Sequence, residues 1–326
     1  MAIIKINNTS FTIIDTKEKM TVPDSFVKRQ NKIMTGNGEA KFYIGHDNEE
    51  IRVFFGKKGF KLKCFFLKKD LLQYMKDAEA EYKNPEQHYR NKAEMPHYWN
   101  ERILKIKELE NELPFTLIEQ TQIAGPRIYV KSDDEVFDLI RELSLPFITY
   151  LSAMKLKASN GEFVFYFRLF VDYFGETEHP LAVKDAQEKI DVETDITDEK
   201  KKDISYARVG QGKYRKGVLE ECPFCPITMV TDDRLLIASH IKPWVVSEEN
   251  EKLDPKNGFM FTPTYDFLFD RGFITFTNNK EMKVSPWLSK MTCSKLNIID
   301  EKKYPMLPVE GRENYLNYHR TNIFKS

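Results

Sequence analysis

The sequence has no excess of charge of either sign. Its 326 residues include 50 basic and 50 acidic side chains, so the formal net charge is zero. A protein without net positive charge is not a general nucleic-acid coat, and any attraction to DNA must come from local basic patches. Hydrophobic residues make up 41 % of the chain, with 24 Phe and 15 Tyr, which is enough to build a sizeable core. The length allows two or three domains.

Cysteine and long hydrophobic runs are also scarce. The spacing of the four cysteines does not suggest a disulfide scaffold, and such a composition fits a reducing compartment. No apolar run approaches the roughly 20 residues needed to span a bilayer. The first residues, MAIIKINN, lack the pattern of a signal peptide. We therefore expect a soluble, cytoplasmic protein.

Residues 1–180 have the pattern of an α+β domain, and we assign them to no known family. Alternating segments separated by turn residues predict strands at 2–15, 40–45, 51–55, 60–67, 115–120 and 127–130. Asn160-Gly161 is a strong hairpin signal and predicts a strand on either side of it, at 147–157 and 162–174. We expect this mixed α/β domain to recognise DNA.

Helices are expected at three places in the same domain. Residues 68–84 have a helical composition, and 86–113 show a long polar helical pattern that is interrupted near Pro96. Four apolar residues at helical spacing predict one buried face on this pattern: Trp99, Ile103, Ile106 and Leu109. Ser132-Asp-Asp-Glu135 resembles a capping box and predicts a helix that continues to Leu143.

The pattern changes after this domain. Residues 181–203 are polar and acidic on balance, which predicts a linker or an exposed connector. Residues 204–326 are expected to form a second domain. It ends in an irregular, Tyr-rich tail from Pro286 onward, which could wrap the domain or contact another subunit.

The most informative pattern in the chain places a histidine, an asparagine and two aspartates in order in the second domain. They are His240, Asn257, Asp266 and Asp270. Four residues make about one helical turn, so the two aspartates share a face and can hold a hard divalent cation. A single imidazole nearby can act as a general base on water beside that metal. This combination is suited to hydrolysing phosphodiesters.

At these residues the sequence, ASHIKPW…LDPKNGFMF…YDFLFDRGFITF, resembles the HNH (ββα-metal) nucleases, and within them a restriction-type and defence-associated subgroup. The resemblance covers roughly residues 204–290 and implies a β-hairpin followed by a helix. It implies that His240 is the general base, that Asn257 braces the loop of the hairpin, and that Asp266 and Asp270 bind the metal. The implied catalytic residues are therefore His240, Asn257 and Asp266.

Two departures from the family bear on the metal. Many HNH nucleases have Asp or His immediately before the base as a further ligand, whereas this chain has Ser239, whose hydroxyl is a poor ligand. Both helix ligands are Asp, where some relatives use His. Magnesium often keeps several waters and few carboxylates, so it tolerates such a site better than a soft transition metal does. The expected cofactor is therefore Mg²⁺, with Mn²⁺ as the alternative.

Cys222-Pro-Phe-Cys225 has the form of half a structural zinc site. Such a site needs four ligands, and a second pair of this kind is missing. Cys293 and a histidine would have to complete it across long separations. We therefore favour two buried thiols in a tight turn.

Basic residues around the motif are candidates for contact with DNA. One cluster precedes the hairpin and two further cations lie beside the motif: Arg208, Lys213, Arg215, Lys216, Lys242 and Arg271. They could neutralise phosphates without reading sequence, or they could belong to ordinary solvated surfaces. In the first domain, lysines alternate with Phe60 and Leu62 along 60–63, so a basic sheet face there could lie on DNA or simply cover a core.

Three functions are compatible with these features. The first is a type II restriction-type DNA endonuclease, and because one HNH site cuts one strand, double-strand cleavage suggests a homodimer on a palindromic site. The second is an endonuclease that cuts only modified, for example methylated, DNA and holds a flipped base in an aromatic pocket. The third is a non-catalytic HNH scaffold that binds DNA, which Ser239 favours and the presence of His240 opposes.

Overall fold

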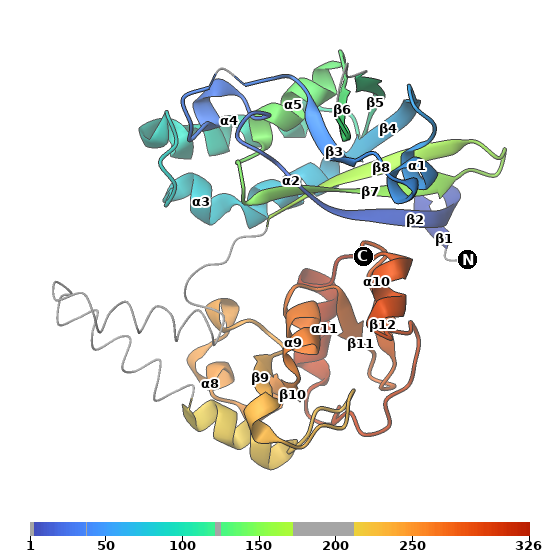
Figure 1. Cartoon of the computed structure of the whole chain (residues 1–326). Coiled ribbons are helices and arrows are strands. Elements are labelled where there is room, and N and C mark those ends of the chain that lie inside the picture. The colour runs from blue at the N-terminus through green and yellow to red at the C-terminus, as the bar shows by residue number, and fades with distance from the viewer. Residues whose placement is uncertain (1–2, 37, 121–124, 172–211) are drawn as a thin grey trace. The chain divides into compact units, whose positions relative to one another are not determined.

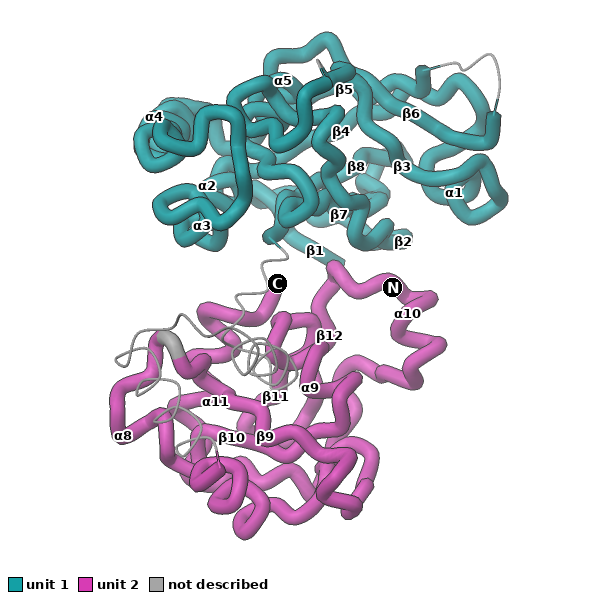
Figure 2. The backbone as a smooth tube through the Cα atoms, turned by 60° about the vertical axis from the view of Figure 1, so that its left-hand side comes forward, with its two compact units in different colours: residues 1–173 teal, residues 174–326 magenta. Residues whose placement is uncertain are grey.

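The computed structural model divides the chain into two compact units, residues 1–173 and 174–326 (Figures 1 and 2). It describes residues 3–36, 38–120, 125–171 and 212–326. The predicted linker at 181–203 and the candidate Arg208 lie outside the described residues. Among the helices in these ranges, none combines the length and the hydropathy that a membrane span requires.

Unit 1 is built on an eight-stranded sheet with the order β1-β2-β7-β8-β4-β5-β6-β3. All neighbouring strands are antiparallel except β4 and β8, which are parallel. The predicted strands are confirmed except for the one at 51–55. The bounds are β1 Ile3–Ile6, β2 Thr9–Thr21, β3 Phe42–His46, β4 Lys61–Leu67, β5 Glu112–Gln120, β6 Arg127–Lys131, β7 Thr149–Lys157 and β8 Phe163–Val171.

Helices cover one face of this sheet through a shared apolar core. The core joins side chains of α1, α2, α4 and α5 to alternate residues of strands β3 to β8. The predicted apolar face of 86–113 lies in it: Ile106 is buried, and Trp99, Ile103 and Leu109 pack against the cluster. The helices are α1 Glu49–Phe55, α2 Lys68–Asp77, α3 Glu79–Lys83, α4 Met95–Glu108 and α5 Glu135–Leu143, with short 3₁₀ turns η1 Arg29–Asn31 and η2 Lys92–Glu94.

The predicted strand at 51–55 is wrong, because capping residues specify the helix α1 there. The side chain of Asn48 accepts a hydrogen bond from the backbone N–H of Ile51 at 2.9 Å, as an N-cap does. Gly56 ends the helix with a φ of 122°, a conformation that favours glycine. Of the residues that suggested a strand, Ile51, Phe54 and Phe55 instead form the buried face of the helix, whereas Val53 is exposed.

Two helix starts also differ from the prediction. Helix α4 begins at Met95, because Pro96 lies in the first turn, where proline needs no hydrogen bond and starts a helix rather than interrupting one. The N-cap of α5 is Asp134 rather than Ser132, and no capping bond forms. The carboxylate of Asp134 instead accepts a hydrogen bond from the backbone N–H of Thr116 at 2.6 Å.

Unit 2 contains a hairpin followed by a helix, and its core is rich in phenylalanine. Strands β9 and β10 pair antiparallel, as do β11 and β12. A further helix occupies 212–221. The other elements are β9 Ile237–His240, α8 Glu249–Lys252, β10 Gly258–Phe261, α9 Pro263–Asp270, β11 Ile274–Phe276, β12 Met282–Val284, α10 Lys290–Lys295 and α11 Glu313–Asn322, with 3₁₀ turns η3 Asp233–Leu235, η4 Trp244–Val246 and η5 Pro255–Asn257.

The tail that was expected to be irregular contains α10 and α11, and α11 packs on the hairpin–helix core. The ring of His319 stacks on Phe269 at a centroid distance of 3.9 Å. Its Nε2 donates to the carbonyl oxygen of Phe269 at 2.9 Å, and its Nδ1 lies 2.9 Å from the hydroxyl of Thr275. Arg312, which is 1 % exposed, donates from Nε to the carbonyl oxygen of Gly258 at 3.0 Å. The tail therefore belongs to the core of unit 2.

A buried polar network joins the helices of unit 1. Arg102 of α4 is 1 % exposed and donates to the hydroxyl of Tyr82 at 2.6 Å and to Oδ1 of Asn31 at 2.9 Å. The amide of Asn31 donates in turn to the carbonyl oxygens of Glu142 at 2.6 Å and Ser144 at 2.8 Å. The network thus satisfies carbonyl groups at the end of α5 that have no partner within the helix.

Replacing the centre of this network should destabilise unit 1. We expect Arg102→Met to lower its free energy of unfolding by roughly 2–4 kcal/mol, because the partner atoms on Asn31 and Tyr82 lose their buried donor. Lys105→Met on the same helix, where the side chain is 49 % exposed, should change stability by less than about 0.5 kcal/mol. Hydrogen exchange of unit 1 peptides in the full-length protein, followed across a urea series, measures both. Equal effects of the two substitutions would contradict the assignment.

Candidate functional site

The site is organised by the hairpin and the helix of unit 2. His240 is the last residue of β9 and pairs with Gly258, the first residue of β10. The loop between them ends at Asn257. Helix α9 follows β10 after a single residue and has Pro263 in its first turn, where proline favours a helix start. This is the strand–loop–strand–helix order that the resemblance implied.

His240 is held in one orientation by two aromatic rings and a backbone carbonyl. Its imidazole stacks on Tyr214 at a centroid distance of 3.9 Å and an interplanar angle of 10°, and Trp244 contacts it edge-on at 5.7 Å. Its Nε2 lies 3.1 Å from the carbonyl oxygen of Lys252. Because a carbonyl can only accept, Nε2 carries the proton in this contact and the lone pair of the neutral ring is on Nδ1.

Burial lowers the pKa of His240 to about 4, and the hydrogen bond to the Lys252 carbonyl opposes this shift only in part. The cause is the loss of water around the charged form of the ring. At neutral pH the imidazole is therefore uncharged. A neutral imidazole with an available nitrogen lone pair is the form in which histidine can accept a proton from water.

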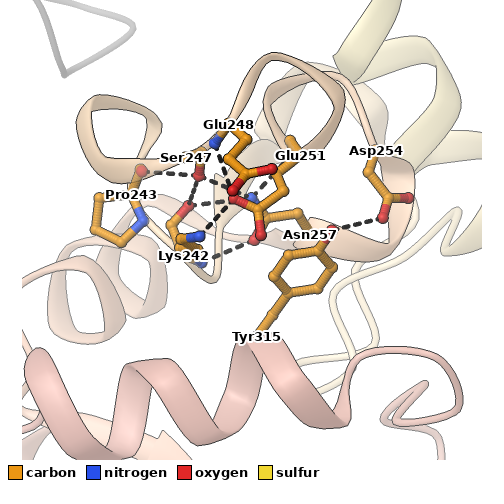
Figure 3. Close-up of polar contacts among 8 residues, drawn as sticks. All are labelled: Lys242, Pro243, Ser247, Glu248, Glu251, Asp254, Asn257 and Tyr315. Atoms are coloured by element: carbon orange, nitrogen blue, oxygen red, sulfur yellow. Dashed lines mark hydrogen bonds and ion pairs between the residues drawn. The ribbon is translucent and has the colours of Figure 1, made fainter.

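Asn257 is completely buried and ties together the two ends of the loop that follows His240 (Figure 3). Its Oδ1 accepts a hydrogen bond from the backbone N–H of Lys242 at 2.8 Å. Its Nδ2 lies 3.1 Å from the carbonyl oxygen of Lys242 and 3.2 Å from that of Glu251. This amide, at the end of the loop, thus satisfies backbone groups at the start of the loop and in α8 in its middle, which fixes the distances between these three segments.

Other side chains of the loop add to this network (Figure 3). Lys242 forms an ion pair with Glu251, whose carboxylate also accepts from the backbone N–H of Glu248 at 2.8 Å and completes a capping box on α8. The hydroxyl of Ser247 donates to carbonyl oxygens at the start of the loop. Tyr315 of α11 donates to Asp254 at 2.7 Å. The loop is therefore pinned to the C-terminal tail as well.

The two aspartates lie on α9 in different environments. Asp266 is 5 % exposed. Burial raises its pKa to about 6, and the charge of Asp270 adds to the shift, while a hydrogen bond from Ser239 and the charge of Arg271 oppose it. The side chain of Asp270 is 49 % exposed, with its Oδ2 3.7 Å from Nε of Arg271. The structure thus brings together Asp266, Asp270 and the hydroxyl of Ser239.

Ser239 and His240 serve different sides of β9. Neighbouring residues of a strand point to opposite faces, so Ser239 reaches the carboxylate of Asp266 on α9, whereas His240 faces Tyr214. The serine therefore occupies the position of the further metal ligand expected from the family. Its hydroxyl donates to Asp266 instead of adding a negative charge.

The oxygen donors around Asp266 fit a hard cation such as Mg²⁺, which can complete its shell with waters and substrate oxygens. In the described ranges, no group of three or more His, Cys, Asp or Glu side chains could hold a metal ion. A tight site made only of protein ligands is therefore not formed there. The thiols of Cys222 and Cys225 are both buried, and no described His, Asp, Glu or further Cys joins them in a group of three.

The candidate DNA-contacting residues differ in whether they face solvent or already contact other residues of the protein. Lys213 is exposed on the 212–221 helix, and the side chain of Lys216 is 80 % exposed. Arg215 donates to the carbonyl oxygen of Asp233 at 2.6 Å. Lys242 is paired with Glu251 in the loop network, and Arg271 lies beside Asp270. Lys213 and Lys216 are thus the members of this set that face solvent on one helix.

The sequence analysis missed the role of Tyr214. Its ring covers His240, and its hydroxyl donates to the backbone carbonyl of Asn257 at 2.9 Å. The signal that could have indicated this contact is Gly258, because a Cβ at that position would lie 2.1 Å from the Tyr214 hydroxyl oxygen. Glycine at this position lets the 212–221 helix approach the hairpin.

A comparison with protein families agrees with this geometry. Residues 225–277 match the family model described as HNH endonuclease, and no curated protein matches the chain. The matched segment contains His240, Asn257, Asp266 and Asp270, and it ends just after β11. The match supports nuclease chemistry, with DNA as the substrate that such a domain implies. Residues 225–277 of unit 2 are therefore similar to an HNH endonuclease domain.

Proposed function

We propose that this protein is a metal-dependent DNA endonuclease of the type II restriction kind, with His240 as its general base. The observation that carries the proposal is the hydrogen bond from Nε2 of His240 to the Lys252 carbonyl, within a segment that matches HNH endonucleases. This bond directs the proton to one nitrogen and keeps Nδ1 ready to accept a proton from the attacking water. The lowered pKa of the ring keeps it neutral at physiological pH.

The remaining residues of the site would hold the cation or keep His240 in its orientation. Asp266 and Asp270 would hold the divalent cation, which in this chemistry stabilises the negative charge on the phosphate and on the leaving 3′-oxygen. Asn257 keeps the loop closed, so that the Lys252 carbonyl stays within hydrogen-bond distance of Nε2 of His240. Tyr214 fixes the plane of the ring and limits access of water to one side of it.

We further propose that unit 1 selects the DNA and that two copies of the chain act together. One HNH site cuts one strand, so cleavage of both strands at a palindrome calls for a two-fold dimer. A protein that is monomeric at micromolar concentration and still breaks both strands in one binding event would contradict the dimer.

Removal of the base should abolish cleavage. With Mg²⁺, the wild-type protein should cut genomic DNA into discrete fragments, and His240→Ala should slow cleavage by roughly a hundredfold or more, because general-base catalysis contributes that much. EDTA should stop the wild-type reaction. The control is His88→Ala, which changes an exposed histidine of unit 1 and should cut normally.

The same digestion, run on paired unmodified and cytosine-methylated DNA, separates a restriction enzyme from a modification-dependent one by the DNA that is cut. Cleavage that survives His240→Ala would contradict the assignment of the base. Metal-dependent binding without cleavage of either DNA would instead point to a non-catalytic scaffold.

The amide of Asn257 should matter through the loop. Asn257→Asp keeps the size and one acceptor but loses the N–H groups that face the carbonyl oxygens of Lys242 and Glu251. We expect kcat to fall by about tenfold or more, with KM nearly unchanged, and stability to fall by roughly 1–3 kcal/mol. Asn250→Asp, an exposed position in the same loop, should change neither. Single-turnover kinetics and thermal unfolding measure the pair, and equal behaviour would refute the bracing role.

The pH dependence of cleavage should follow Asp266 rather than His240. The raised pKa of Asp266, about 6, means that acid protonates this carboxyl and weakens cation binding while His240, with a pKa of about 4, remains neutral. Activity should therefore fall as pH decreases through about 6. Higher Mg²⁺ concentrations should move this fall to lower pH, because the cation competes with the proton for the carboxylate. A fall near pH 6.5 that does not respond to Mg²⁺ would indicate an ordinary histidine instead.

A further inference from the structure

Unit 1 presents a basic and aromatic face that its own helices do not cover. In β5 and β6 every second residue belongs to the core, namely Leu113, Phe115 and Leu117, then Ile128 and Val130. The residues between them point away from the core, and they are partly or fully exposed. We define the outer face by six residues of this side of the sheet and its edge: Lys41, Tyr43, Lys61, Arg127, Tyr129 and Lys131.

Strand register makes these residues neighbours. Lys61 of β4 pairs with Ile118 of β5, which pairs with Lys131 of β6. Tyr129 of β6 pairs with Tyr43 of β3, the edge strand. The outer face therefore runs without interruption across four strands.

The aromatic pair at the edge is positioned and accessible. The rings of Tyr43 and Tyr129 lie 5.6 Å apart at 52°, and both side chains are only partly buried. The Nζ of Lys41 lies 4.7 Å from the centroid of Tyr129. The Tyr43 hydroxyl is 2.7 Å from Nδ1 of His46, and a bulge between Tyr43 and Gly45 bends the strand here. Bulges of this kind re-aim side chains at functional edges.

The charge of the outer face suits a polyanion. The outward positions of β5 from Thr116 onward and of β6 carry no acid. Acidic partners come from flanking segments: Glu39 lies 2.6 Å from Lys41, and Asp133 lies 4.0 Å from Lys131. Exposed pairs like these are weak, so phosphates can replace the carboxylates. Arg127 is exposed and forms no ion pair among the described residues.

We propose that the outer face binds an unpaired stretch of DNA, with its cations on the phosphates and Tyr43 and Tyr129 stacked on bases. A face four strands wide is broader than the roughly 12 Å major groove of B-form DNA, and aromatic rings on such a face stack on bases only where the bases are unstacked. The choice of DNA as the polyanion rests on the proposed function. The stacking of Tyr43 and Tyr129 on bases rests on the residues of the outer face and does not depend on nuclease activity.

The test uses the full-length His240→Ala protein, which should bind DNA without cutting it. Fluorescence anisotropy measures its affinity for a labelled single strand of about 20 nucleotides and for the matching duplex. Tyr43→Ala with Tyr129→Ala should weaken single-strand binding by about tenfold or more. Lys61→Ala with Lys131→Ala should reduce the slope of the logarithm of the binding constant against the logarithm of the salt concentration by about 0.7 per lysine removed. Tyr43→Phe, which keeps the ring, and Lys107→Ala, an exposed lysine on α4, should bind like the parent.

Two outcomes overturn the proposal: single-strand binding that the tyrosine and lysine variants leave unchanged, or binding restricted to the duplex. Thermal unfolding of each variant excludes loss of fold as the cause of weaker binding. If the wild type cuts no DNA but the variants still weaken binding, the proposed nuclease function fails and the outer face stands. If the wild type cuts DNA and the variants bind normally, the nuclease function stands and the proposal for the outer face fails.

Discussion

The hydrogen bonds of one buried amide, that of Asn257, fix the loop on which the rest of the site depends. An amide can donate and accept at once, so this single side chain pairs with the N–H and C=O groups of Lys242, at the start of the loop, and with the C=O group of Glu251, in its middle. The loop in turn places the Lys252 carbonyl against the imidazole of His240. A carboxylate has no donor and a hydrophobic side chain has neither group, so replacing Asn257 would leave buried backbone groups without partners.

The chemistry of His240 comes from packing rather than from neighbouring charge. Tyr214 covers one side of the imidazole, and burial, not a nearby cation, is the main reason that its pKa is low. Burial also disfavours the charged form of Asp266, and because a carboxyl group is charged when deprotonated, its pKa rises instead of falling. Removal of water thus leaves a neutral imidazole on one side of β9 and a carboxyl group with a raised pKa on the other. Ser239 donates a hydrogen bond to Asp266, which favours the charged form of that carboxyl group without adding a charge of its own.

Local signals in the sequence sufficed where short-range chemistry decides the structure. The Asn160-Gly161 turn and the alternation of the strands predicted the sheet, and the family resemblance around His240, Asn257 and Asp266 implied the hairpin and helix of the site. Prediction failed at 51–55, where the cap at Asn48 outweighed the β-propensity of the residues that follow it. It also failed for contacts between distant segments, such as Tyr214 on His240, because no local pattern encodes which remote ring will cover a given side chain. Gly258 is a local sign of that contact, because a side chain there would collide with Tyr214.

The segment that matches the HNH endonucleases cannot account for the site by itself. Tyr214 precedes residues 225–277, and Arg312, Tyr315 and His319 follow them, yet these four contact the hairpin, the loop and α9 directly. Gly272 shows the same dependence, since a Cβ there would lie 2.1 Å from the carbonyl oxygen of Ile323, in the tail. The end of α9 is therefore shaped to receive the C-terminal residues. The residues that position His240 and the aspartates therefore extend from the 212–221 helix to the tail, and the matched segment is the centre of this arrangement rather than the whole of it.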